Sequence, residues 1–348
     1  MRGYKPYNEI KNTQPTRATC FHPTGDCFVV GSNNRTMSIC RYPTKAEINS
    51  FTVDDLPTSP DVYFSFFQTH KGSIYCASFD NAGQLLATGS NDQTVRVIKY
   101  NPETHQPEDC EYKLQMHSGT VRDISFTKDN QSALLLSAGA GDFEIYVTDC
   151  QTMKLVKTFK GHSSTVMSLH SWDSGNKLFV SGSLDKTIKL WDLRCDQAVS
   201  TWSAPTTPMN TNSESCEFCP INVVRVDSTG QLLVSGHKNG SCMFYDLRCR
   251  RVIQLFQPHT AEIRSLNFSP KNYYLLTSSY DHKVKLFDIQ GDLTNKLTSV
   301  DVAELGDRVV QTAWHPTDYN FVTTCADGTA TLWTIPIDFS SEAENSVD

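Results

Sequence analysis

The feature that most constrains this chain is one pattern that occurs seven times along its 348 residues. Each copy has an apolar run, a turn of small residues around an Asp or Asn, and alternating apolar positions that end in an aromatic side chain or a substitute for it. Successive turn residues are 42 to 58 positions apart. They are Asn34, Asp92, Asp142, Asp185, Asn239, Asp281 and Asp327. Repetition at such a spacing is the signature of a repeat architecture.

The alternation within each copy predicts β-strands, because successive side chains of a strand point to opposite faces. Further short strands precede the turns, as in Val121–Phe126 and Ile263–Phe268. A four-stranded sheet cannot bury both of its faces alone, so we expect seven such units to stack radially and cover one another. The sequence therefore predicts an all-β fold, a single seven-bladed β-propeller with four-stranded antiparallel blades.

The two ends of the chain decide how such a ring closes. The seventh copy ends at Pro336 without a fourth strand, and Tyr4–Lys11 has the character of a strand. We expect Tyr4–Lys11 to complete the seventh blade, which gives one domain over residues 1–336 and a flexible acidic tail over 337–348. Two stretches rich in Pro, Ser, Thr and Asn, 43–60 and 203–215, are predicted to be flexible loops between blades.

The copies resemble the WD-repeat family, in which a His, a Ser or Thr, an Asp and a Trp form a hydrogen-bonded tetrad within a blade. The fourth copy matches all four positions, with His162, Ser181, Asp185 and Trp191. Three other copies match three positions, and the third copy has one extra residue in its turn. Their residues are His70, Thr88 and Asp92; His117, Ser137 and Asp142; and His259, Thr277 and Asp281. The first, fifth and seventh copies lack the His.

A His near an Asp and a Ser also suggests a hydrolase triad. Four sets in the same register favour architecture instead, because an enzyme needs only one site. The chain has no P-loop, no H-E-x-x-H and no G-x-S-x-G motif. The one close cysteine pair, Cys216 and Cys219, lacks a second pair at zinc spacing. We therefore expect no catalytic residues, no cofactor and no metal.

The formal net charge of −7 argues against a protein that wraps nucleic acid, which would need a basic surface. No run approaches the ~18 apolar residues of a membrane span. The beginning of the chain has no secretory signal pattern. We expect a cytoplasmic protein whose partners are other proteins, and neither nucleic acid, nor membrane, nor a small-molecule substrate.

The WD-repeat resemblance implies a binding face formed by the starts of the innermost strands and by the residues before the turn Asp. In this sequence that face combines cations with aromatic and apolar side chains, which interfaces favour and which would attract an acidic or amphipathic peptide. The alternative is an ordinary solvated rim with a few cations. The predicted face consists of Arg17, Tyr75, Arg122, Met167, Leu184, Lys238, Arg264, Tyr280 and Arg308.

Three segments resemble the propeller of a microtubule-associated member of the family: His70–Val97, Ser137–Gln151 and Asp288–Leu297. This resemblance implies a cytoskeletal scaffold in neurons or cilia, with partners that are microtubule-associated or regulate minus ends. The helical LisH and CTLH segments of that member are not found in this chain, so only the docking role of its propeller is expected here.

Parts of the sequence also resemble proteins of two other functional classes. Substrate receptors of cullin–RING ubiquitin ligases end a blade with W-D-x-R, and Trp191–Arg194 fits this motif while Tyr245–Arg248 nearly does. In that alternative, Arg194 and Arg248 would contact the ligase adaptor. The fourth copy also resembles signalling β-subunits, but that function needs a coiled-coil helix and the first ten residues contain no heptads.

Overall fold

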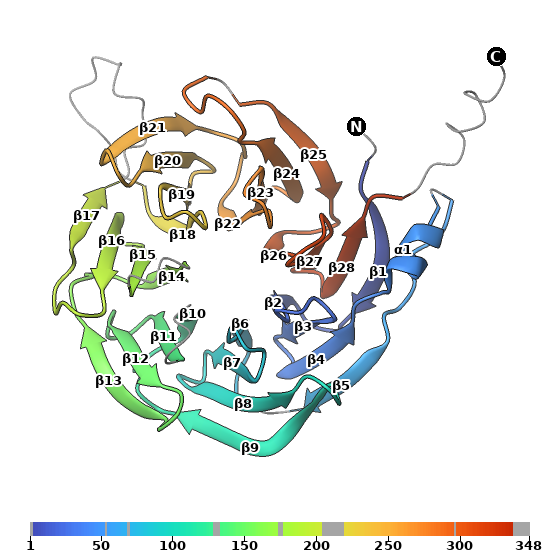
Figure 1. Ribbon diagram of the computed structural model, residues 1–348, viewed down its shortest axis with the longest axis horizontal. Helices are drawn as coiled ribbons and strands as arrows, with labels where there is room; N and C mark the ends of the chain where they lie inside the picture. Colours follow the sequence, from blue (N-terminus) through green and yellow to red (C-terminus); the bar gives the residue numbers. More distant parts are fainter. Residues whose placement is uncertain are drawn as a thin grey trace.

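The computed structural model shows seven four-stranded antiparallel sheets arranged as blades around a central channel (Figure 1). It describes residues 3–52, 54–67, 70–127, 133–172, 177–203, 219–295 and 297–336. The predicted all-β, seven-bladed propeller is confirmed. The predicted tail, 337–348, and most of the predicted loop 203–215 lie outside the described residues, as does Cys216.

Within each blade the strands run from the channel outward in chain order, apart from the seventh blade. From the innermost strand outward, the first blade consists of β2 (Thr16–Phe21), β3 (Cys27–Ser32), β4 (Thr36–Arg41) and β5 (Val62–Phe67), and the second of β6 (Ile74–Phe79), β7 (Leu85–Ser90), β8 (Val95–Asn101) and β9 (Gln106–Leu114). The third blade consists of β10 (Val121–Phe126), β11 (Leu134–Gly139), β12 (Ile145–Asp149) and β13 (Lys154–Phe159). The fourth consists of β14 (Val166–Ser171), β15 (Leu178–Ser183), β16 (Thr187–Asp192) and β17 (Ser200–Ser203).

The fifth blade consists of β18 (Ile221–Val226), β19 (Leu232–His237), β20 (Cys242–Asp246) and β21 (Arg251–Phe256). The sixth consists of β22 (Ile263–Phe268), β23 (Tyr274–Ser279), β24 (Lys283–Asp288) and β25 (Ser299–Glu304). The seventh consists of β26 (Val309–Trp314), β27 (Phe321–Cys325), β28 (Thr329–Thr334) and β1 (Lys5–Lys11). Strand β1 pairs antiparallel with β28, from Lys5 opposite Thr334 to Lys11 opposite Thr329. The N-terminal strand therefore closes the ring, as the sequence predicts.

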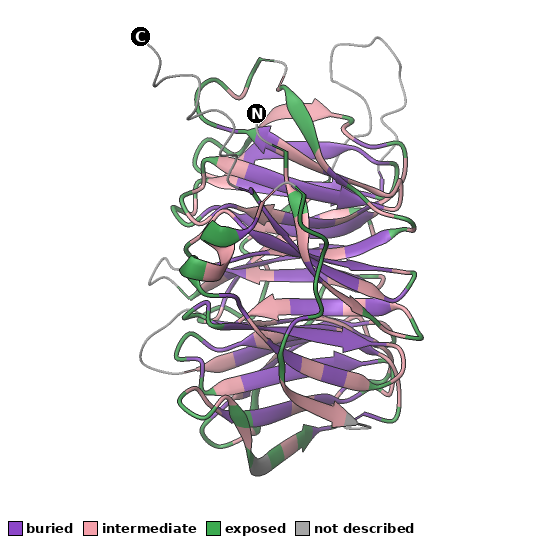
Figure 2. Ribbon diagram, turned by 90° about the vertical axis from the view of Figure 1, so that its right-hand side faces the viewer, coloured by how far each residue is buried: buried purple, intermediate pink, exposed green. Residues whose placement is uncertain are grey.

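The hydrophobic core is divided among the interfaces between neighbouring blades, where buried residues run through the sheets (Figure 2). Trp191 of the fourth blade is fully buried, and its ring packs 5.2 Å from that of Phe159 in the third blade. Small residues at the end of the second strand allow this close packing. A Cβ atom on Gly182 would lie 2.7 Å from the Ile221 side chain of the next blade. Packing between the fourth and fifth blades thus explains the glycine at this position.

A β-bulge occurs at the same place in all seven innermost strands. The first residue of each strand pairs with the second strand, the next residue is skipped, and pairing resumes one position later. A bulge leaves one residue unpaired and changes the direction of its side chain. The seven skipped residues are Arg17, Tyr75, Arg122, Met167, Asn222, Arg264 and Val310. We call them the bulge residues.

The prediction that residues 43–60 form a loop between two blades is wrong, because this segment joins β4 and β5 of the first blade. This segment, which we call the strap, contains the helix α1 (Lys45–Ser50). Thr44 and Glu47 form a capping box, and Glu47 also accepts hydrogen bonds from both terminal nitrogens of Arg41. The composition suggested a loop because a six-residue helix is too short for its periodicity to show.

The strap then lies along β1 (Figure 1). The Glu9 amide donates to the Thr58 carbonyl at 2.8 Å, and the Thr58 amide donates to the Tyr7 carbonyl at 3.0 Å. Phe51 is 6% exposed and packs edge-on against the Tyr7 ring. An insertion of the first blade therefore holds the strand that closes the seventh.

Candidate protein-binding face

The four side chains of the fourth-blade tetrad form one hydrogen-bonded chain. The indole N–H of Trp191 donates to the Ser181 hydroxyl at 2.8 Å, and that hydroxyl lies 2.6 Å from Nε2 of His162. Nδ1 of His162 is 2.7 Å from a carboxylate oxygen of Asp185. A neutral histidine that donates from Nδ1 and accepts at Nε2 satisfies every contact. Ser181 and Trp191 are fully buried, so these hydrogen bonds satisfy polar groups inside the fourth blade.

The second and sixth blades have the same arrangement without the tryptophan. His70 contacts Thr88 at 2.8 Å and Asp92 at 3.1 Å. In the sixth blade His259 lies 2.8 Å from both its threonine and its aspartate, Thr277 and Asp281.

The third blade differs from the sequence prediction. His117 contacts Ser137 at 2.8 Å, but its Nδ1 is buried without a partner. Asp142 instead accepts hydrogen bonds from the Tyr146 hydroxyl, at 2.9 Å, and from the Ser118 amide. The extra residue in this turn moves the carboxylate away from the imidazole, and the tyrosine takes its place.

Burial and hydrogen bonding shift the pKa values of these groups in opposite directions. Burial raises the pKa of Asp281, but the hydrogen bond and the charge of His259, together with hydrogen bonds from the Thr260 and Lys283 amides, more than offset this and bring the pKa to about 2. Burial lowers the pKa of His117 to about 4, because the displaced Asp142 only partly opposes it. The carboxylates are thus held ionised and His117 is held neutral near neutral pH.

One further pair was missed by the sequence comparison. In the seventh blade the indole N–H of Trp333 donates to the Thr323 hydroxyl at 2.9 Å, which reproduces the Trp–Ser bond of the fourth blade. The spacing of ten residues between the two members is the same in both blades, and this spacing was the available signal.

The bulge residues all line one small cavity of about 60 Å³ at the end of the channel where the predicted turn residues lie. We call this end the mouth. The Tyr75 ring lies between two guanidinium groups, with Arg17 at 5.0 Å and Arg122 at 4.7 Å from its centre. Cation–π contacts of this kind hold a guanidinium in place without neutralising its charge.

A second tyrosine on the same face repeats this arrangement. Tyr280 lies in the turn of the sixth blade, and the guanidinium groups of Arg264 and Arg308 are each 5.4 Å from the centre of its ring. The structure thus brings together six of the nine predicted face residues around two tyrosines.

Two of the arginines at the mouth are short of partners. The Nε atoms of Arg122 and Arg264 are buried and have no hydrogen-bond partner among the described residues. Burial lowers the pKa of Arg122, and the positive charges of Arg264 and Arg17 lower it further. Arg17 itself donates from Nε to the Asn33 side chain at 2.6 Å. Cationic groups from three blades therefore converge on the mouth.

The cavity has a polar floor made by Asp123 and Arg225. Their side chains are 4.0 Å apart, and both also line the larger hollow of about 370 Å³ on the other side. Asp123 accepts a hydrogen bond from the Leu169 amide at 2.8 Å, and Arg225 donates to the Ser168 hydroxyl at 2.9 Å. These bonds connect the third, fourth and fifth blades.

Of the remaining predicted face residues, Met167 lines the cavity, and Leu184 and Lys238 do not. Leu184 is in the turn of the fourth blade, and Met167 is a bulge residue. Lys238 is exposed on the rim and lies 3.8 Å from Glu262. Arg308 is also exposed and lies 3.5 Å from Asp307.

Two mouth residues were missed from sequence, and one assignment needs correction. Arg308 was aligned with Arg17, but the residue equivalent to Arg17 in the seventh blade is Val310. Asn222 was missed because the fifth copy has no His from which to count. Counting instead from the first residue of each innermost strand would have found both.

The W-D-x-R arginines lie in the loops after the third strands, away from the mouth. Arg194 forms an ion pair with Asp192 of its own motif, in which its Nη2 atom lies 2.6 Å from a carboxylate oxygen. Arg248 is exposed, and its amide donates to Asp246. Arg194 thus serves in part to close its own turn.

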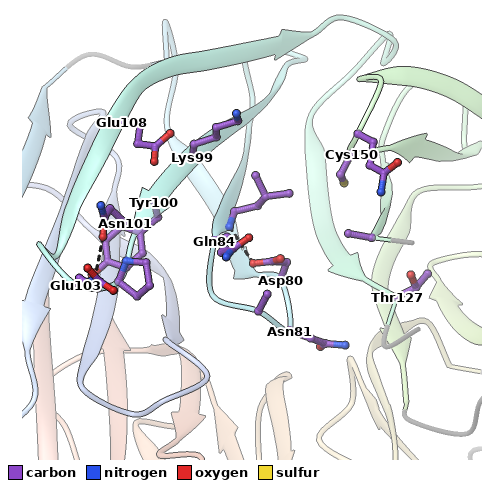
Figure 3. Close-up of a pocket in the computed structure, with 15 residues that line it drawn as sticks. Asp80, Asn81, Gln84, Lys99, Tyr100, Asn101, Glu103, Glu108, Thr127 and Cys150 are labelled. Atoms are coloured by element: carbon purple, nitrogen blue, oxygen red, sulfur yellow. Dashed lines mark hydrogen bonds between the residues drawn. The ribbon is translucent and has the colours of Figure 1, made fainter. Parts of the chain in front are cut away.

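A hollow of about 800 Å³ forms a polar groove between the second and third blades (Figure 3). Some of its polar groups are engaged within the protein. Asp80 accepts from the Leu85 amide at 2.8 Å, and the Asn101 side chain accepts from the Glu103 amide at 2.9 Å. The groove shows no nucleophile beside a base among the residues drawn.

In the described part of the chain, no group of three or more His, Cys, Asp or Glu side chains is placed to hold a metal ion. The same residues include no helix of the length and apolar character needed to cross a membrane.

Comparison with known proteins connects this geometry to a family. A model described as the nucleolar protein 10-like N-terminal domain matches residues 100–327, and a WD domain, G-beta repeat model matches residues 62–99. Protein tipD of Dictyostelium discoideum is 28% identical over 269 residues, which cover 76% of this chain and 40% of tipD. A guanine nucleotide-binding protein subunit beta of Oryza sativa subsp. japonica is 24% identical, over 64% of this chain and 73% of that protein.

A third relative is nuclear distribution protein PAC1 of Arthroderma otae, which is 28% identical over 60% of this chain and 43% of its own length. The chain thus spans less than half of tipD and of PAC1. The family model of the nucleolar protein 10-like domain covers more than half of the chain, and the seven blades agree with it. The chain belongs to the WD-repeat β-propellers, in the family of nucleolar protein 10-like N-terminal domains.

Proposed function

We propose that this protein is a non-catalytic scaffold that docks an acidic peptide segment of another protein at the mouth. The observation that carries the proposal is the pair of buried, unpartnered Nε atoms on Arg122 and Arg264. A buried polar group without a partner costs free energy, and an acidic ligand would recover it. The tyrosines beside these arginines add the aromatic surface that protein interfaces favour.

We further propose a cytoplasmic, cytoskeleton-associated role with microtubule-associated partners. Two observations support it. Segments of this chain resemble the propeller of nemitin, a microtubule-associated WD-repeat protein. One relative is named as a nuclear distribution protein.

The double substitution Arg122→Glu with Arg264→Glu tests the docking site. We expect it to abolish affinity capture of the main partner, because two carboxylates would then repel an acidic ligand. The melting temperature should stay nearly unchanged, since neither side chain takes part in the tetrads or the strand pairing. Capture is measured by mass spectrometry, and microtubule co-sedimentation is then measured with and without the captured partner.

The matched control carries Arg194→Glu with Arg248→Glu, which makes the same charge change away from the mouth. We expect it to capture the partner as the unmodified protein does. Unimpaired capture by the mouth variant would contradict the proposed site. Loss of a cullin–RING adaptor only in the control variant would support the ligase alternative.

A further inference from the structure

We propose that Ser59, in the strap, is phosphorylated by a proline-directed serine/threonine kinase, and that the phosphate releases the strap from β1. The inference does not depend on the mouth or on what binds there. It is carried by the exposure of Ser59, by the few hydrogen bonds that hold the strap, and by the charges that surround it.

The serine has the neighbour and the exposure that such a kinase needs. Ser59 is followed by Pro60, the pair of residues that this class of kinase modifies. It is exposed, and its hydroxyl has no hydrogen-bond partner among the described residues. The neighbouring Thr58 differs, because its hydroxyl donates to the Asn8 side chain at 2.8 Å. The hydroxyl that precedes the proline is therefore the free one.

The chain contains two other pairs of this kind, Thr207–Pro208 and Ser269–Pro270. Thr207 lies outside the described residues. Ser269 is 2% exposed, and its hydroxyl accepts a hydrogen bond from the Tyr274 amide at 3.1 Å. Of the two pairs that the structure describes, only that of Ser59 has an accessible hydroxyl, and Ser269 is its buried counterpart.

Few bonds hold the strap at this point. The Thr58 amide and carbonyl pair with Tyr7 and Glu9 of β1, at 3.0 and 2.8 Å. Pro60 is buried, so a kinase can bind the serine and the proline together only after this part of the strap has left β1. A segment with few contacts opens locally at a smaller free energy than the whole protein. The modification therefore takes place on the open strap.

The charges beside Ser59 oppose a phosphate when the strap closes again. Ser59 lines a cavity of about 200 Å³ whose charged residues are Arg41, Glu47 and Asp61. Arg41 donates through both terminal nitrogens to Glu47, at 2.9 and 2.7 Å, and through Nε to Asp61 at 2.9 Å. A phosphoryl group, with roughly −1.5 to −2 charges, would meet two carboxylates around one guanidinium that is already engaged by both.

The rest of the strap and β1 bring no cation to this cavity. Asp54 and Asp55 add two negative charges to the strap. The lysines of the two segments do not line the cavity; they are Lys45, Lys5 and Lys11. A phosphate on Ser59 is therefore repelled from the closed position, and the strap stays open.

The modification transfers a phosphoryl group from ATP. The Ser59 hydroxyl oxygen bonds to the γ-phosphorus while the bond from that phosphorus to the bridging oxygen of ADP breaks, and a carboxylate of the kinase takes the hydroxyl proton. The products are phosphoserine, ADP and a proton. With the strap released, the outer edge of β1 loses its partner and becomes open to other chains.

The full chain, incubated with ATP and a proline-directed kinase, tests the inference. Mass spectrometry should find phosphate on Ser59 and none on Ser269. Phe51→Ala removes the contact between the strap and Tyr7, and should accelerate phosphorylation of Ser59 at least ~5-fold because the strap is then open more often. Hydrogen exchange at the Glu9 and Thr58 amides should be faster in the phosphorylated protein, and phosphatase treatment should restore it.

Ser59→Ala is the matched control, since it keeps the other sites for the kinase, Thr207 included. Its exchange should be unchanged by the same treatment; an equal increase would place the effect at another residue and overturn the inference. Lack of phosphate on Ser59 in both the unmodified chain and the Phe51→Ala variant would overturn the site. Phosphate on Ser59 with unchanged or slower exchange at Glu9 and Thr58 would overturn the release of the strap.

Discussion

At the scale of single residues, the His, the Ser or Thr and the Asp of a tetrad make different contacts in different blades, because the backbone of the turn differs. His162 and His259 each link a hydroxyl to a carboxylate, whereas His117 reaches only its hydroxyl. The sequence pattern identifies all three histidines, since the spacing to the Ser or Thr is nearly constant. It does not show that Tyr146 replaces His117 at the aspartate, because that depends on where one inserted residue directs the carboxylate.

Replacing Asp185 with alanine should lower the free energy of unfolding by about 1–3 kcal/mol, because it leaves hydrogen-bond donors unpaired, among them the buried Nδ1 of His162. The donors are Nδ1 of His162 and the amides of Ser163 and Thr187. Urea unfolding of the purified protein measures the loss. Asp142→Ala is the matched control and should cost less, since no histidine donates to that carboxylate; equal losses would contradict the assignment.

The pH dependence of stability should show the contribution of His117. Its pKa is lowered by burial to about 4 in the folded protein, against about 6.5 in an unfolded chain. The unfolded state therefore binds the proton first as the pH falls, and stability is lost between about pH 6.5 and about pH 4. His117→Asn should remove about 2 kcal/mol of the difference between the unfolding free energies at pH 7 and pH 4.5. A variant with an unchanged pH profile would show that His117 is not held neutral.

At the scale of elements, the repeated apolar runs and alternating positions predict the inner strands of each blade, because these strands are buried, and the second strand of each blade is buried on both faces. Short elements on the outside are not visible in that pattern. The helix α1 and the strap are stabilised by Thr44, Glu47 and Phe51, a cap and one aromatic contact that leave no periodic signal. The bulges are equally invisible in a single copy, since they appear only when the two paired strands are compared.

Replacing Phe51 with alanine should release the strap from β1. We expect faster hydrogen exchange at the amides of Lys5–Lys11, because the Tyr7 contact and the hydrogen bonds to Thr58 are then lost together. Exchange in the other blades should not change. Leu56→Ala is the control, because Leu56 is 82% exposed and should leave exchange in β1 unaltered; unchanged exchange in the Phe51 variant would mean that the strap does not hold β1.

At the scale of the whole molecule, stability depends on the closure of the ring. Each blade buries its faces only against its neighbours, and β1 and β28 join the two ends of the described chain in one blade. Sevenfold repetition was enough to predict this closure from the sequence. It was not enough to predict the mouth in full, because the identity of the bulge residue differs from blade to blade.

Deleting residues 1–11 should remove the outer strand of the seventh blade and expose the edge of β28. An unpaired edge strand associates readily with other chains, so we expect aggregation and a broader, less cooperative thermal transition. Light scattering and differential scanning calorimetry measure these two effects. A monomeric protein with an unchanged transition would contradict the role of β1 in closure.

The seven bulges affect which substitutions such a protein can accept in the course of evolution. Each blade contributes one position whose backbone stands outside the ladder, so a new side chain there alters what the mouth attracts while the pairing of the strands is kept. Because each of the seven positions lies on its own blade, single substitutions at them can change the ligand preference step by step. Specificity and foldability are therefore largely uncoupled in this architecture.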